Sequence, residues 1–252
     1  MLPDGFVSTR TTCQLPACRV ESLLEGVFTL QLKEKMEKII LRGANFKYWK
    51  ENILLCLVTM AFSSVMVIVN KLNLPGEIHR LETRWDLAIP VILPFVLVYL
   101  LYFPFVYLGW AYIFAWWPRY FRPYAIAMMT IGLITGIINI TYQTYAPRAV
   151  VDNTDMLARM LIWLYNLNRP LTALPSLHVS HSLCTGYFLS KISPKWTWLW
   201  MSTVVLISIS TLFVKHHYIA DVVIGGLLGA IVCLAIDVIW EGRAASRSLV
   251  KE

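Results

Sequence analysis

The sequence predicts an all-α polytopic membrane protein, a bundle of six transmembrane helices preceded by an amphipathic segment. Of its 252 residues, 58% are apolar and only 15% are charged, and the mean hydropathy is +0.61. A soluble domain of this length carries about 25% charged residues, because its surface must be solvated. The apolar residues here also form long runs instead of recurring at the spacing of a soluble core. Together these observations exclude a water-soluble fold.

Six apolar runs are expected to cross the membrane, since a hydrocarbon core of roughly 30 Å takes about 20 helical residues. They cover residues 52–69, 87–117, 124–142, 175–192, 196–214 and 218–240. The second run is too long and contains Pro90, Pro94 and Pro104, which predicts a kink or a shallow interfacial start. The fourth run is short, so its first residues are expected near or just below the membrane surface.

The membrane domain is expected to cover residues 51–241, between a tail of residues 1–50 and a tail of residues 242–252. In the first tail, residues 23–42 place apolar side chains ahead of a basic stretch. This pattern indicates an interfacial amphipathic helix, with a disordered tail as the alternative. In the last span, Gly225 and Gly229 form a small-xxx-small pair that permits close helix packing.

The distribution of basic residues predicts the orientation. The two tails, the loop after the second span and the loop after the fourth span hold 15 of the 22 Lys and Arg residues, and the opposite side holds 7. By the positive-inside rule, both termini are cytoplasmic in a multi-pass protein of the plasma (inner) membrane. The net charge of +7 is therefore interpreted as orientation and contact with the lipid bilayer, and no nucleic acid partner is expected.

Four of the five histidines lie at span ends on the predicted non-cytoplasmic side: His178, His181, His216 and His217. His217 is followed four residues later by Asp221, at the start of the sixth span. This spacing places the carboxylate beside the imidazole, where it fixes the tautomer of one ring nitrogen and raises the basicity of the other. An aspartate near the end of a membrane helix is costly unless it is paired or solvated. The pair therefore predicts a basic or nucleophilic histidine.

A second polar feature is the run Pro175-Ser176-Leu177-His178, which opens the fourth span. Pro175 suits the first helical position, so the next three amides would be unpaired donors at a positive helix end. Such an end binds anions. Cations on the same side include Arg148, Arg159, Arg169 and Lys215. Histidines, a carboxylate, free amides and cations at a lipid boundary indicate phosphate chemistry on a lipid.

At these residues the sequence resembles the type 2 phosphatidic acid phosphatase superfamily of membrane phosphatases and phosphotransferases. The pattern of that family has three parts: Lys-x6-Arg-Pro, Pro-Ser-Gly-His and Ser-Arg-x5-His-x3-Asp. The second part resembles residues 175–178, and the third resembles the set Ser210, Thr211, His217 and Asp221. The resemblance covers about residues 148–229 and, through the six-span plan, most of the membrane part.

The departures from that pattern point to one branch of the family. Leu177 replaces the glycine and Thr211 replaces the arginine, while Lys215 adds a cation within the third part. These features look like the branch that includes the inositol phosphorylceramide synthases and their bacterial relatives. In the first part, Arg148 is kept, but the proline after it is lost and Thr141 stands where the lysine would be.

The resemblance implies a role for six residues. His217 would attack phosphorus to form a phosphohistidine, Asp221 would orient it, and His178 would protonate the leaving lipid oxygen. The residues that would bind the phosphate oxygens are Arg148, Ser176 and Lys215. This chemistry implies no cofactor and no metal. The alternative metal site would be built from His178, His181, His217 and Asp221.

Hydrolysis of a membrane lipid phosphate is the favoured reaction, because no acceptor-binding motif can be recognised in the sequence. The alternative within the family is a phosphotransferase of the inositol phosphorylceramide synthase type, which moves a phospho-headgroup to an alcohol. A proton-coupled transporter is the alternative of another class, and it predicts ionisable residues at span centres. Here the span centres are essentially uncharged, which argues against a transporter.

Overall fold

The structure is a computed structural model, and it describes residues 52–62, 76–146, 148–153, 155–167, 170–171 and 173–249, with side chains up to residue 242. The chain forms two compact units, Met1–Asn45 and Phe46–Glu252, and all described residues belong to the second. The predicted amphipathic segment 23–42 lies outside the described residues, as do residues 63–69 of the first predicted span and Arg169.

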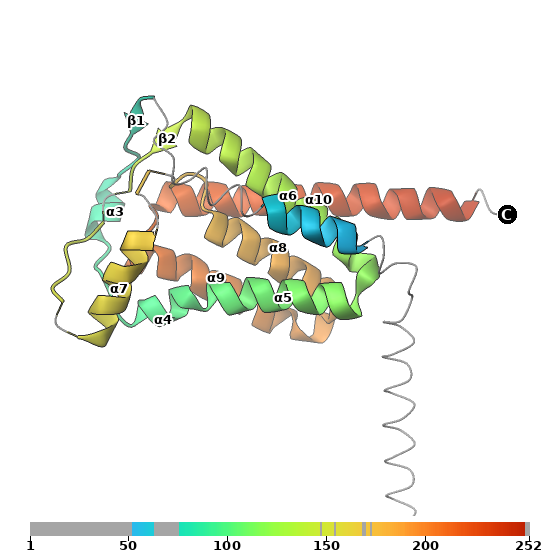
Figure 1. The fold of residues 1–252 in the computed structure, drawn as a ribbon, viewed down its shortest axis with the longest axis horizontal. Coiled ribbons are helices and arrows are strands. Elements are labelled where there is room, and N and C mark those ends of the chain that lie inside the picture. Colours follow the sequence, from blue (N-terminus) through green and yellow to red (C-terminus); the bar gives the residue numbers. More distant parts are fainter. Residues whose placement is uncertain are drawn as a thin grey trace, which may run out of the picture. The chain divides into compact units, whose positions relative to one another are not determined.

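The second unit is mostly helical (Figure 1). After a helix at Asn52–Phe62, the helices are α3 (Arg84–Ala88), α4 (Phe95–Leu100), α5 (Tyr102–Trp116), α6 (Pro118–Thr141), α7 (Met156–Leu167), α8 (Leu177–Ile192), α9 (Thr197–Phe213) and α10 (Ile219–Leu249). A 3-10 turn, η1 (Pro194–Trp196), precedes α9. Two short strands, β1 (Ile78–His79) and β2 (Gln143–Thr144), pair in parallel, with Ile78 opposite Gln143. Part of the predicted C-terminal tail is thus a continuation of α10.

Among the described residues, four helical segments are long and apolar enough to cross a membrane. They are Phe95–Trp116, Pro118–Thr141, Pro194–Phe213 and Ile219–Gly242, and they correspond to the second, third, fifth and sixth predicted spans. The fourth predicted span is α8, which has 16 residues and is therefore about 24 Å long. The first is described only at Asn52–Phe62. The count of six spans stays a prediction.

The second predicted span is divided at Pro90 and Pro94, whereas Pro104 lies within the first turn of α5. Helix α3 ends before Ile89, whose backbone is extended (φ −69°, ψ 120°), as expected for a residue that precedes a proline. Helix α4 then begins after Pro94. The expected interruption is therefore a break, and α3 is a separate short helix instead of the first turn of the span.

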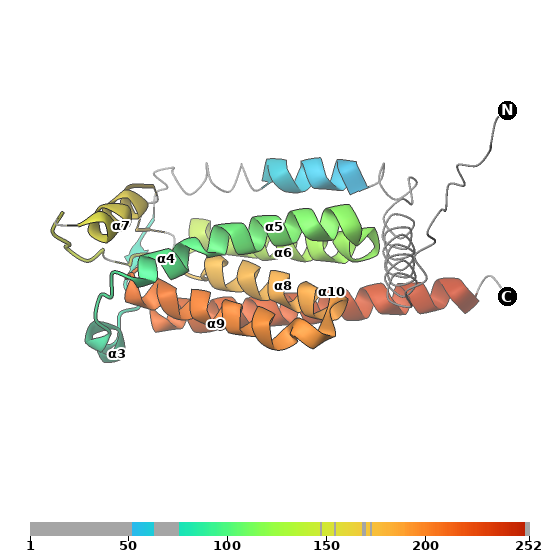
Figure 2. The same cartoon turned by 90° about the horizontal axis from the view of Figure 1, so that it is seen from below.

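The prediction places no helix between the third and fourth spans, whereas the structure has α7 there. Ala158, Leu161 and Leu164 of this helix are fully buried, while Trp163 is 55% exposed. A run of 12 residues is too short to indicate a span, so the length of apolar runs does not predict this helix. Helices α3 and α7 lie at the same end of the unit as the start of α4 (Figure 2).

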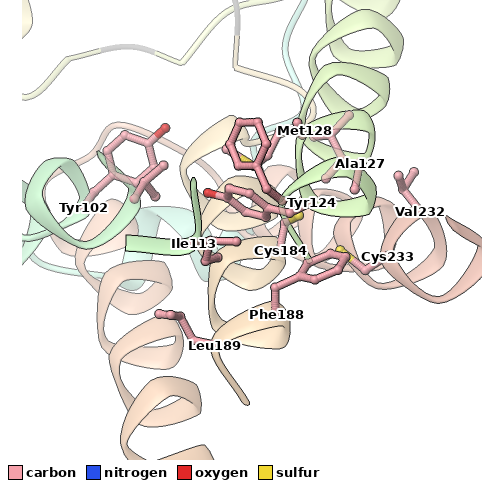
Figure 3. Close-up of a cluster of buried hydrophobic side chains, with 14 of the residues drawn as sticks. Tyr102, Ile113, Tyr124, Ala127, Met128, Cys184, Phe188, Leu189, Val232 and Cys233 are labelled. Carbon is pink, nitrogen blue, oxygen red and sulfur yellow. The ribbon is translucent and has the colours of Figure 1, made fainter. Parts of the chain in front are cut away.

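Helix α8 lies at the centre of the bundle, where it contacts α5, α6, α9 and α10. Buried side chains from α5, α6, α8 and α10 fill the space between these helices, with Tyr124 and Phe188 packed edge to face (Figure 3). The hydroxyl of Tyr124 lies 3.0 Å from that of Thr185, so its polar group is satisfied inside the core.

Helices α8 and α10 touch backbone to backbone. A Cβ atom at Gly225 would lie 2.6 Å from the carbonyl oxygen of Ser176, and one at Gly229 would lie 3.0 Å from that of Ser180. Only residues without a Cβ permit this approach. The close packing that the sequence predicts at the two glycines is therefore present, and it joins the N-terminal ends of the helices that carry His178 and Asp221.

Candidate active site

The site forms where α8 and α10 begin, and the start of α8 differs from the prediction. The helix begins at Leu177, and Ser176 is its N-cap, with Oγ accepting a hydrogen bond from the amide of Val179 (3.4 Å). Pro175 therefore precedes the cap and is not the first helical residue. The Ser176 amide donates to the Asp221 carbonyl at 3.1 Å, so it is not one of the free donors that the sequence led us to expect.

His217 and Asp221 are brought together as predicted. Nδ1 of His217 lies 3.6 Å from Oδ2 of Asp221, and both side chains are buried. The same Oδ2 accepts a hydrogen bond from the amide of Tyr218 (2.8 Å), which fixes the carboxylate as part of the N-terminal cap of α10. Within the described residues, His217 Nδ1 and Asp221 Oδ1 have no hydrogen-bond partner. The carboxylate thus faces Nδ1 and leaves Nε2 to the site.

His178 lies between His217 and a tyrosine. Its Nδ1 is 3.4 Å from His217 Nε2, and its Nε2 is 2.8 Å from the hydroxyl of Tyr99. One set of tautomers satisfies this row of groups: Tyr99 donates to His178 Nε2, His178 Nδ1–H points at His217 Nε2, and His217 Nδ1–H points at Asp221. In this arrangement the Nδ1–H of His178 and the Nε2 lone pair of His217 face the same space.

Sequence reasoning missed Tyr99, which is fully buried in α4. A tyrosine inside an apolar run is typical of a core or a membrane-interface position, and its partner lies 79 residues away. The one available signal was the predicted break in the second span, because a helix that begins at Pro94 places Tyr99 near the membrane surface.

Arg148 supplies a buried positive charge beside the histidines. Its guanidinium carbon lies 5.0 Å from the centre of the Tyr165 ring, and Nε and Nη1 are buried without a hydrogen-bond partner in the described part of the chain. Burial lowers the pKa of Arg148, but a guanidinium remains charged at physiological pH. A buried cation without a carboxylate is costly, so this position suits an anion.

Lys215 is directed to another element. Its Nζ donates to the backbone carbonyl of Asp86 in α3 at 2.6 Å, and its backbone is left-handed, with φ 50°. The predicted contact of Lys215 with phosphate would require the side chain to leave this hydrogen bond. The structure thus brings together Arg148, Ser176, His178, His217 and Asp221, and gives Lys215 a partner in α3.

Two histidines that are not among the six predicted site residues, His216 and His181, lie close by. The His216 ring is buried, 4.9 Å from the ring of Tyr99 and 5.8 Å from that of His178. Burial, followed by the charge of Arg148, lowers the pKa of His216 well below its usual value, which favours the neutral ring. His181 lies further along α8, with Nδ1 3.4 Å from the hydroxyl of Tyr102. No group of three or more His, Cys, Asp and Glu side chains among the described residues could hold a metal ion.

The fold and the site define a helical membrane protein with a histidine–aspartate pair, a second histidine and a buried arginine at one end of its bundle. Residues 120–243 match the family model of the PAP2 superfamily. This range contains all six of the residues predicted for the site. No curated protein and no solved structure matches the chain.

Proposed function

We propose that the protein is a lipid phosphate phosphatase of the PAP2 superfamily that acts through a phosphohistidine on His217. The observation that carries the proposal is the row Tyr99–His178–His217–Asp221, in which each side chain faces the next. The match of residues 120–243 to the family model supports the same reaction class.

In the first step, Nε2 of His217 attacks phosphorus and the bond from phosphorus to the lipid oxygen breaks. His178, which carries a proton on both ring nitrogens once the phosphate anion is bound, gives its Nδ1 proton to that oxygen and becomes the neutral imidazole, so the lipid leaves as a neutral alcohol. Asp221 stabilises the positive charge that develops on the His217 ring, and Arg148 stabilises the charge on the phosphoryl oxygens. The 3.4 Å between the two imidazoles leaves no room for a phosphoryl group, so the rings must separate when substrate enters.

In the second step, water attacks the phosphohistidine. His178, now without its acidic proton, accepts a proton from the water, and His217 leaves as the neutral imidazole. An alcohol in place of water would give transfer instead of hydrolysis. Leu177, Thr211 and Lys215 support a phosphotransferase of the inositol phosphorylceramide synthase type as the second candidate, because they depart from the phosphatase pattern.

The proposed substrate is a lipid phosphate of the non-cytoplasmic leaflet, with both termini of the chain cytoplasmic. A lipid could reach the short helix α8 laterally while its tails stay in the bilayer, where each buried methylene contributes about 0.8 kcal/mol. To test the orientation, Glu77→Cys and Lys195→Cys are introduced separately into a cysteine-free variant. An impermeant thiol reagent should label the first in intact cells and the second only after permeabilisation. The reverse pattern would place the site in the cytoplasmic leaflet.

The reaction is tested by assaying the purified protein with lipid phosphates of different backbones, with and without candidate alcohols. Free phosphate indicates hydrolysis, and new phospholipid indicates transfer. A phosphoenzyme that survives alkali and is lost in acid should accumulate, and vanadate should inhibit as a mimic of pentacoordinate phosphorus. Activity should persist in chelator. Its loss there, with recovery on addition of one divalent metal, would contradict the metal-free mechanism.

A further inference from the structure

Asp86 connects the short helix α3 to the turn that carries His217. It lies outside the residues that match the family model, and it is 2% exposed. Its Oδ2 accepts a hydrogen bond from the amide of Thr83 (2.9 Å), and also one from the Thr83 hydroxyl. Its Oδ1 accepts a hydrogen bond from the amide of Ile219 at 2.8 Å. One buried carboxylate is thus shared between two helix starts.

The backbone of the same residue holds the other end of the turn. The carbonyl of Asp86 accepts the hydrogen bond from Lys215 Nζ (2.6 Å). Lys215 begins the turn and Ile219 is the first residue of α10, so His217 lies midway between two points that Asp86 holds. The left-handed backbone of Lys215 (φ 50°) is unfavourable for a residue with a side chain, so this conformation needs external support.

The carboxylate of Asp86 is itself fixed before it reaches the turn. Thr83 and Asp86 form a reciprocal capping box at the start of α3, which restricts the side chain to one rotamer. A negative charge at the N-terminus of α10 is also favoured by the helix dipole. The turn is therefore held by a preorganised group, and its position sets where His217 meets Asp221 and His178.

We propose that Asp86 is a positioning residue for the reaction, which keeps the imidazole of His217 in line with Asp221 and with the phosphoryl group. The proposal rests on the proposed function, in which His217 is the nucleophile. In this arrangement Lys215 acts through its bond to α3, and not as a ligand of phosphate. Replacement of Asp86 should therefore lower the rate of the chemical step, while the contacts with phosphate stay in place.

The test compares Asp86→Ala, Asp86→Asn and Ile219→Pro in the full-length protein, with Glu82→Gln as a control. Glu82 is an exposed neighbour whose charge lies close enough to act on Tyr218 of the turn. Its change removes the same charge but leaves both hydrogen bonds of Asp86 to the turn in place. Ile219→Pro removes the donor from the other side of the bond, at the first helical position, where proline is tolerated. It keeps the test valid if Asp86→Ala does not fold.

Displacement of a nucleophile by about 1 Å can cost roughly 100-fold in rate. We therefore expect Asp86→Ala and Ile219→Pro to lower kcat about 100-fold, with KM for the lipid phosphate changed less than about threefold. Asp86→Asn, which keeps an acceptor for Ile219, should fall between these variants and the wild type. Glu82→Gln should match the wild type. Hydrogen exchange of the amides in the turn after α9 should be faster in Asp86→Ala and unchanged in Glu82→Gln.

Wild-type kcat in a folded Asp86→Ala or Ile219→Pro variant would overturn the proposal, and so would unchanged exchange in the turn of Asp86→Ala. A large rise in KM with kcat preserved would also overturn it, because it would indicate a role in binding. If the wild-type protein turned over no lipid phosphate, the proposed function would fail. The exchange measurement would still report whether Asp86 holds the turn, so the two failures are distinguishable.

Discussion

At the far end of the α8–α10 pair, Lys191 donates to both carboxylate oxygens of Asp237 (2.6 Å each) and to Glu241 (2.7 Å), and the Tyr187 hydroxyl donates to Asp237 (2.6 Å). At the near end, Asp221 Oδ1, His217 Nδ1 and two nitrogens of Arg148 are buried without a partner in the described structure. The far-end charges all lie on α8 and α10, whereas at the near end Asp221 lies on α10, His217 in the turn before it and Arg148 in the segment after β2.

The difference between the ends lies in what each leaves unpaired. A buried polar group without a partner costs free energy, and a cluster arranged for stability alone would pair its members, as around Asp237. We infer that a ligand pairs with the two nitrogens of Arg148 that have no partner among the described residues. Only an anion would satisfy both Arg148 and a protonated histidine.

The largest effects are expected when one residue is replaced at each end of the α8–α10 pair. His217→Ala should abolish the phosphoenzyme and lower kcat by roughly 10⁴-fold or more, because it removes the proposed nucleophile. Asp237→Asn should keep kcat within about threefold of the wild type, but should destabilise the fold by about 1–3 kcal/mol, because Lys191 and Tyr187 lose an ionised partner. Turnover by His217→Ala at the wild-type rate would remove the basis for the nucleophile. Assays with the same lipid phosphate and thermal unfolding in detergent provide both measurements.

An intermediate effect is expected from two adjacent glycines of α10. Gly225→Ala places a methyl group 2.6 Å from the Ser176 carbonyl, whereas at Gly226 the nearest atom is a Val179 methyl at 3.9 Å. The first variant should lose about 1–3 kcal/mol of stability through overpacking, and should lose activity because Ser176 and Asp221 move apart. The second should retain activity, with stability unchanged or up to about 1 kcal/mol higher, since alanine favours helix. Equal behaviour of the two variants in thermal unfolding and turnover assays would show that the backbone contact is not needed.

The smallest effect concerns pH. His216 faces Arg148, His178 and His217, and its pKa in the folded protein is lowered by burial and by these groups. Between this value and the unfolded value of about 6.5, the unfolded state binds more protons, so stability falls as the pH falls below about 6.5. His216→Phe should reduce this loss of unfolding free energy by at most about 1.4 kcal/mol per pH unit. Melting temperatures of both proteins between pH 7 and 5 measure this, and parallel curves would contradict the assignment.

The sequence predicted the parts of the fold that depend on long apolar runs. Four runs became helices of spanning length, and the prolines of the second marked its break. The proximity of His217 and Asp221, which follows from local spacing, was also predictable, whereas their catalytic roles stay predictions. Helix α7 was not predictable in this way, because its buried face is short. Tyr99 and Asp86 were not, because their partners lie 79 and 133 residues away, and no local pattern indicates such a contact.

Lys215 also shows that local spacing does not indicate a long-range contact. Its position two residues before His217 suggested a phosphate ligand, and local spacing gives no reason to choose otherwise. The choice depends on α3, whose carbonyl accepts the ammonium. A cation in a motif indicates that an anion or a dipole is near, but the tertiary structure determines which of these the cation contacts.

The backbone contact between α8 and α10 also determines how the site can open. The Ser176 amide donates a hydrogen bond to the Asp221 carbonyl, and the Ser176 backbone packs closely against Gly225. The two helix starts are therefore held together. We infer that the imidazoles of His178 and His217 separate by ring rotation, without any helix sliding. A rotation of His178 breaks its bond to Tyr99, and that bond is remade when product leaves. Opening of the site by this rotation would cost the one hydrogen bond between Tyr99 and His178.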